Sequence, residues 1–133
     1  MNDTKVWTSC FSRVRLLPKP DLFTTGIEPV AISRGIPRWF KGRRELRLAP
    51  AREKLWIPDA EFVAYYDDLL NSLDPRQLWE DLTEGGRKAA CLLCWEKPGE
   101  PCHRQTVAEW FERHLGIVVP EWGGDIDSAP PHA

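Results

Sequence analysis

The residues of this sequence that could do chemistry gather in one stretch near its C-terminal end. Cys94 and Glu96 close an apolar run, and Cys102, His103 and Arg104 follow a short loop rich in proline and glycine. A cysteine that opens a helix beside an arginine has a lowered thiol pKa, because the helix dipole and the cation both favour the thiolate. We therefore predict Cys102 as nucleophile or acid, Glu96 as general base, and His103 as a third catalytic residue. Alternatively, Cys102 only caps the helix and its sulfur is inert.

Two cationic side chains at a helix start also predict an anion. His103 and Arg104 would oppose the positive end of the helix dipole, which is unfavourable unless an anion lies among them. A phosphate or carboxylate ligand could be that anion, held by backbone N–H groups and by the fork of Arg104. Glu96 is the internal candidate for the same place. The alternative is that Arg104 forms a salt bridge with Glu96 or Glu100 and that no ligand is involved.

The chain has four cysteines, and the spacing between them excludes some of the roles that cysteines can have. Cys91 and Cys94 lie in one predicted strand, so their Cα atoms would be about 10 Å apart and their side chains on opposite faces. Neither a disulfide nor a shared metal is then reachable for this pair. Cys94 is freer to approach Cys102 and His103, but zinc would still need a fourth ligand. We therefore predict no metal and no other cofactor, and buried positions for Cys91 and Cys10.

A basic segment with interleaved aromatic residues lies before the middle of the chain. Its cations are Arg34, Arg38, Lys41, Arg43, Arg44, Arg47, Arg52 and Lys54, and its aromatic residues include Trp39, Phe40 and Trp56. Such a stretch suits a groove for a nucleotide or single-stranded nucleic acid, since cations meet phosphates and ring faces meet bases. The alternative is a solvated loop whose aromatic residues are anchored in the core. The candidate substrate-binding residues are Arg104, Cys94, Ser33, Arg34, Trp39 and Lys41. Ser33 can join Cys94 only if the strands that they end are adjacent.

The elements that must position these residues follow from hydrophobic spacing and from breakers. Strands are predicted at 6–11, 29–33 and 89–95, with a possible short last strand at 117–119. Helices are predicted from Pro58 to about Leu73, from Pro75 to about Leu82 with Asp74 as cap, and from Cys102 to a stop at Gly116. Residues 13–26 read as loop, and residues 36–56 show no clear period. Alternating strands and helices predict an α/β fold, as a single three-layer domain with a small, mostly parallel sheet.

Composition limits the class of protein. With 133 residues and 42% hydrophobic content, the chain can bury one core, and a net charge of −2 does not by itself indicate nucleic-acid binding. We expect one domain over residues 1–122 and a flexible tail over 123–133. No apolar run reaches the length of a membrane span, and the N-terminus lacks the apolar core of a signal peptide. We therefore expect a cytoplasmic protein without membrane contact, in which clustered cysteines indicate a site, a metal or burial before disulfides.

The chain resembles the domain of unknown function 488 family in three motifs that occur in the same order. They are the strand end Val30 to Arg34 followed by Pro37-x-Trp39-Phe40, then Leu48-Ala49-Pro50, then Cys94-x-Glu96 with Cys102-His103-Arg104. The resemblance runs from about Val6 to about Trp122. It implies a small α/β protein of bacterial, archaeal or phage type whose functional centre is the strand-loop-helix site. The family name implies no reaction.

Three functions remain open from the sequence. The first is an enzyme that acts on a phosphorylated or nucleotide-like substrate through Cys102, Glu96 and His103. The second is a non-catalytic nucleic-acid-binding module that uses the basic, aromatic segment 34–56. The third is a structural role for the cysteines, as a metal or redox staple. The expected partner is therefore an anionic small molecule or a nucleic acid, and the sequence does not indicate an oligomeric state.

Overall fold

A small parallel sheet forms the centre of the computed structural model, which describes residues 4–15, 26–95 and 103–122. Its strands are β1 (Val6–Cys10), β2 (Ile27–Ala31), β3 (Arg43–Arg44) and β4 (Ala89–Cys94), in the order β1-β4-β2-β3. Every pairing is parallel, so the mostly parallel sheet that we predicted is parallel throughout the described strands. Strand β4 lies between β1 and β2, and all six of its residues are buried. Burial on both faces explains why this strand is apolar without alternation.

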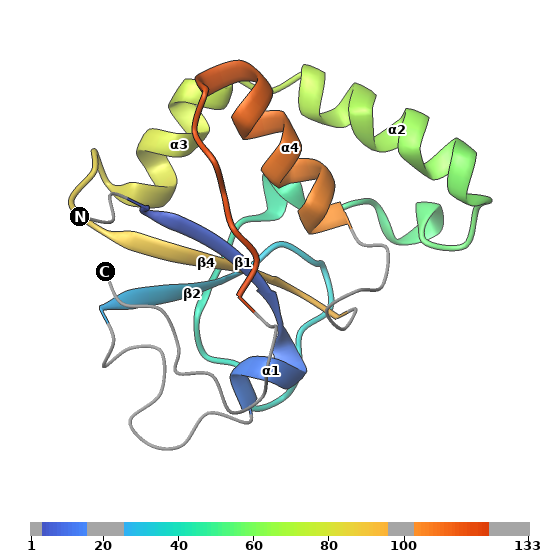
Figure 1. The fold of residues 1–133 in the computed structure, drawn as a ribbon. Coiled ribbons are helices and arrows are strands. Elements are labelled where there is room, and N and C mark those ends of the chain that lie inside the picture. Colours follow the sequence, from blue (N-terminus) through green and yellow to red (C-terminus); the bar gives the residue numbers. More distant parts are fainter. Residues whose placement is uncertain (1–3, 16–25, 96–102, 123–133) are drawn as a thin grey trace.

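Helices cover both faces of this sheet. They are α1 (Phe11–Arg15), α2 (Asp59–Asn71), α3 (Pro75–Thr83) and α4 (His103–Leu115), and two short 3₁₀ turns lie at Leu46–Leu48 and Arg52–Lys54. Figure 1 shows α2, α3 and α4 on one side of the sheet and α1 on the other. The predicted single three-layer α/β domain is therefore confirmed. Within the described ranges, no helix has the length and apolar character needed to cross a membrane.

The side chains of β4 divide the core into two halves. Leu92 and Cys94 point to the face that α2, α3 and α4 cover, whereas Cys91 and Leu93 point to the opposite face, where they meet Phe11. This alternation follows from the period of two along a strand. The predicted opposite orientation of Cys91 and Cys94 is confirmed.

The helix ends match the local signals in the sequence. The Asp74 side chain accepts hydrogen bonds from the backbone N–H groups of Arg76 and Gln77, as an N-cap does. The Gln77 side-chain amide donates to the Asp81 carboxylate one turn further on. Gly116 has a φ of 67°, which a glycine adopts without strain, and α4 ends just before it.

Three predictions about strands are wrong: two concern where a strand begins or ends, and one concerns a strand that does not form. The first strand ends at Cys10 and α1 follows directly, where we predicted strand to residue 11 and loop from residue 13. The second strand covers residues 27–31 rather than 29–33. No strand forms at 117–119; instead the Pro120 carbonyl accepts from the Thr8 N–H at 3.0 Å, and the Trp122 N–H donates to the Thr8 carbonyl at 2.7 Å. The chain after α4 thus runs back to cover the open edge of β1 (Figure 1), which a local pattern cannot predict.

Candidate functional site

The carboxyl ends of β1, β2 and β4 share one edge of the sheet, and α4 begins at the same edge. Strands β2 and β4 are directly paired, which confirms the adjacency on which the Ser33 prediction depended. Beyond the strand ends, the Ser33 hydroxyl and the indole N–H of Trp95 both donate to the Gly35 carbonyl, at 2.7 and 3.0 Å. The ends of the two central strands are therefore tied together. In open α/β sheets, ligands bind at this edge.

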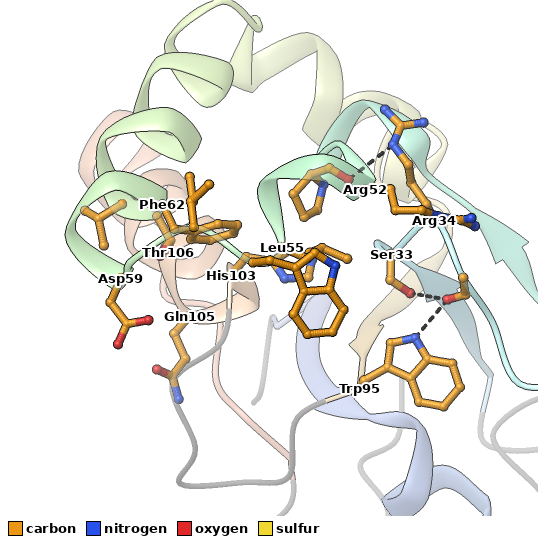
Figure 2. Close-up of a pocket in the computed structure, with 15 residues that line it drawn as sticks. Ser33, Arg34, Arg52, Leu55, Asp59, Phe62, Trp95, His103, Gln105 and Thr106 are labelled. Atoms are coloured by element: carbon orange, nitrogen blue, oxygen red, sulfur yellow. Dashed lines mark hydrogen bonds between the residues drawn. The ribbon is translucent and has the colours of Figure 1, made fainter.

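A pocket of about 580 Å³ opens at this edge (Figure 2). Its wall is built from the end of β2, residues 50–57, the start of α2, Trp95 and the start of α4. Of the residues predicted for the site, Ser33, Arg34 and His103 line it. The volume lies within the range of small-ligand sites. The structure thus brings together three predicted residues from two separate motifs.

His103 is held in the pocket wall by two other elements. Its Nε2 lies 2.7 Å from the Ile32 carbonyl oxygen, and its ring meets Tyr66 edge-on at a centroid distance of 5.3 Å. A carbonyl oxygen only accepts hydrogen bonds, so Nε2 must carry a proton and donate. In the neutral ring, Nδ1 then carries the lone pair. This packing leaves 8% of the residue exposed.

Arg104 points into the protein rather than into the pocket. Its side chain is fully buried, and its Nε and Nη2 donate to the two carboxylate oxygens of Glu121, each at 2.8 Å. The Thr8 hydroxyl donates to the same carboxylate at 2.7 Å. Partial burial alone would raise the pKa of Glu121, but the hydrogen bonds from Arg104 and Thr8 and the charge of Arg104 outweigh it and lower that pKa. This ion pair fastens the start of α4 to the segment that edges β1.

Cys94 lies beside the same arginine at the end of β4. It is buried and disulfide-bonded, and its Sγ is 2.9 Å from Nη1 of Arg104. From the sequence we expected the clustered cysteines to form a site, to bind a metal or to be buried rather than to form a disulfide. Cys91 is a free, buried thiol on the other face of the sheet, and burial raises its pKa. Two of the catalytic candidates, Glu96 and Cys102, lie outside the described residues.

Trp39 and Lys41 do not line the pocket. The Trp39 ring packs edge-on against Phe11 and Phe40, at centroid distances of 6.4 and 6.2 Å, in the half of the core on the α1 side of the sheet. Lys41 is exposed. The structure therefore does not bring these two residues to Ser33 and His103.

Two of the eight cations of the basic segment, Arg43 and Arg47, attach the segment to the rest of the domain. Arg43 forms an ion pair with Glu28 at 3.0 Å and donates to the Asp81 carbonyl, and Arg47 forms ion pairs with Glu45 and Asp81 at 2.7 and 3.0 Å. Burial would raise the pKa of Glu45, but the hydrogen bonds and charge of Arg47 lower it. These cations are compensated within the fold.

Other residues of the pocket were not singled out from the sequence. Arg52 and Trp56 were visible only as members of the basic segment, whereas Trp95, Asp59 and Gln105 carried no signal that linked them to the site. Glu121, the described carboxylate that Arg104 meets, was also missed. It follows Arg104 by 17 residues, and no local pattern relates two positions so far apart.

The fold and the pocket define a class of protein: a small parallel α/β domain with a ligand-sized cavity at the carboxyl edge of its sheet. A family model described as domain of unknown function DUF488 matches residues 27–111. This range is more than half of the chain, so the chain belongs to the DUF488 family. The match runs from the start of β2 into α4 and is shorter than the resemblance seen from the motifs. No curated protein and no solved structure matches the chain.

Proposed function

We propose that this chain is an enzyme that binds a phosphorylated or nucleotide-like substrate in the pocket at the carboxyl edge of its sheet. The observation that carries the proposal is a pocket of about 580 Å³ with two arginines, Arg34 and Arg52, in its wall. A cavity of this size with a few convergent polar groups is the usual form of a small-ligand site. Guanidinium groups bind phosphate oxygens through paired, charge-assisted hydrogen bonds. An anionic ligand therefore matches this wall best.

The two arginines have donors to spare for such a ligand. Arg34 is oriented by one hydrogen bond from its Nε to the Pro50 carbonyl at 3.1 Å, while its own carbonyl accepts from Arg44. Arg52 is exposed and begins a 3₁₀ turn. Within the described part of the chain, no carboxylate forms an ion pair with either guanidinium. Both charges would thus be available to a ligand.

The catalytic part of the proposal keeps the residues that the sequence suggested. His103 borders the pocket and would move a proton, with Cys102, as a reduced thiol, acting as nucleophile or acid and Glu96 as general base. Arg104 has a different role in this proposal, because two nitrogens of its guanidinium group already donate hydrogen bonds to Glu121. In this proposal Arg104 positions the start of α4 rather than holding the substrate.

The alternative function, a nucleic-acid-binding module, would draw its affinity from the basic segment 34–56. Arg43 and Arg47 already meet carboxylates of the same chain. Neutralised cations release few counterions from a nucleic acid, so they contribute little to its binding. We therefore prefer the small-ligand site.

Binding is tested by the melting temperature of the protein with phosphorylated compounds and with their unphosphorylated counterparts. Arg52→Gln removes one charge from the pocket wall, and Arg38→Gln is the matched control, because Arg38 is an exposed arginine of the same segment outside the pocket. We expect phosphorylated compounds to raise the melting temperature and Arg52→Gln to weaken their binding about tenfold or more, the value of a hydrogen bond to a charged group. Equal weakening in both variants would contradict the proposal.

The chemical step is tested separately, by the alkylation rate of Cys102 in the reduced protein, mapped by peptide mass over a range of pH. A thiol that reacts with a pKa well below about 8.5 supports the nucleophile. An unreactive Cys102 removes that role and leaves ligand binding as the function of the pocket.

A further inference from the structure

The exposed apolar side chains of this protein cluster at the pocket. Six large hydrophobic side chains are exposed among the described residues, and four of them, Leu55, Trp56, Val63 and Trp95, line the pocket. Trp56 is 87% exposed. An isolated exposed apolar residue needs no explanation, but a group of them beside a cavity marks a binding surface. The pocket therefore offers apolar contacts in addition to its two cations.

One of the two tryptophan rings is held ready for such a contact. The indole N–H of Trp95 is tied to the Gly35 carbonyl, and the Phe11 ring packs edge-on against it at a centroid distance of 5.1 Å. The residue is nevertheless 52% exposed. Trp56, in contrast, packs against no other aromatic ring of the described chain. The pocket thus contains one tryptophan ring that is held in place, Trp95, and one that is open to solvent, Trp56. Two such rings suit a planar ligand, because aromatic rings stack on ring faces.

The polar groups of the pocket lie at separate ends. In Figure 2, Arg34 and Ser33 lie at one end, Asp59 and Gln105 at the other, and Leu55 between them. The first end offers guanidinium donors, which suit an anion, whereas the Ser33 hydroxyl already donates its proton to the Gly35 carbonyl. The second offers an amide, which donates and accepts, and a carboxylate, which accepts from N–H groups and repels phosphate. A ligand with an anionic end, a flat middle and a polar ring edge fits this order.

We infer that the ligand is a nucleoside phosphate, an inference that rests on the proposed function. Its base stacks on the pocket tryptophans, its phosphate lies at Arg34 and Arg52, and the polar edge of the base faces Gln105. Base–aromatic stacking accepts any base, so selection among bases falls to the amide and carboxylate end of the pocket. The nucleotide can be free or part of a single strand, since both present the same groups.

The test compares the affinities of ribose 5-phosphate and of the four ribonucleoside 5′-monophosphates, measured by titration calorimetry. The variants are Trp56→Ala, Trp56→Phe and, as a control, Val118→Ala, an exposed apolar residue outside the pocket. We expect the monophosphates to bind about tenfold or more tightly than ribose 5-phosphate. Trp56→Ala should weaken the monophosphates by about five- to hundredfold, the worth of stacking, and leave ribose 5-phosphate unchanged. Trp56→Phe should restore most of the affinity.

Equal affinity for ribose 5-phosphate and the monophosphates, with no effect of Trp56→Ala on either, would overturn the inference and leave the anion site intact. If no phosphorylated compound binds, the inference and the proposed function both fail. A short single-stranded oligonucleotide in the same titration identifies the source of the nucleotide. If the oligonucleotide binds more tightly and with steep salt dependence, the pocket binds a nucleotide that is part of a strand. That result would support the inference, because a free nucleotide and one within a strand present the same base and phosphate.

Discussion

Replacing Glu121 by glutamine tests whether the ion pair with Arg104 fastens the start of α4. Gln keeps one oxygen but places an NH₂ group against a guanidinium nitrogen, so at least one of the hydrogen bonds of 2.8 Å is lost together with the charge. Arg104 is fully buried, whereas the Glu121 side chain is 27% exposed. Removing one partner of a buried pair costs about 3–5 kcal/mol, and the partial exposure of Glu121 places the cost near about 3 kcal/mol.

The assay is urea unfolding followed by tryptophan fluorescence, with Glu112→Gln as the control, because Glu112 is an exposed carboxylate on α4. The loss for Glu121→Gln corresponds to a melting temperature about 10 °C lower. The control should change the free energy of unfolding by less than about 0.5 kcal/mol. Equal losses for the two variants would refute the structural role of the pair.

The pH dependence gives a second check on the same pair. The pKa of Glu121 is lowered in the folded protein, so its carboxylate contributes stability above the unfolded pKa of about 4.3, and that stability is lost as the pH falls through the folded pKa. Glutamine does not titrate. The difference in free energy of unfolding between wild type and Glu121→Gln should therefore shrink below about pH 4. A difference that stays constant into acid would contradict the ion pair.

Three further substitutions test individual contacts that stabilise the fold. Gly42→Ala would place a Cβ in steric clash with the Pro29 carbonyl oxygen and should cost about 3 kcal/mol in urea unfolding, whereas Gly35→Ala, whose Cβ meets no atom closer than 4.0 Å, should change little. Asp74→Ala removes the cap of α3 and should cost about 1 kcal/mol by the same measurement. Tyr66→Phe deletes a buried hydroxyl that donates to a carbonyl at 2.5 Å, and a loss of about 1–3 kcal/mol is expected in thermal unfolding. A neutral Gly42→Ala, Asp74→Ala or Tyr66→Phe would each contradict the contact in question.

The local elements of the fold could be predicted because their signals lie within a few residues. Asp74 and Pro75 mark a helix start by themselves, and Gly116 marks a stop. The unbroken apolar run of β4 indicates a strand covered on both faces. The pairing of β4 with β2 was an assumption, although parallel strands joined by helices favour it. The fold class thus follows from short-range chemistry.

The composition of the site could be predicted only in part. Ser33 and His103 were found because reactive residue types at strand and helix ends point to the edge of a sheet, and Arg34 was found as a cation of the basic segment. Gln105 was not found, since its place in the wall depends on how α4 packs beside α2. Glu121 was not found either, because its partner comes from the return of the chain to the edge of β1. Both are consequences of long-range packing, which local patterns do not contain.

The most direct test of the proposed pocket is a titration with adenosine monophosphate, followed through the NMR signals of the tryptophan indole N–H groups. The chain has seven tryptophans. Trp56 and Trp95 line the pocket, whereas Trp7 and Trp122 lie in the core half on the α1 side of the sheet. Substitution of Trp56 and of Trp95 by phenylalanine assigns the two pocket signals. We predict that these two signals shift and saturate together while the others stay in place; movement of only the Trp7 and Trp122 signals, or of none, would contradict the proposed site.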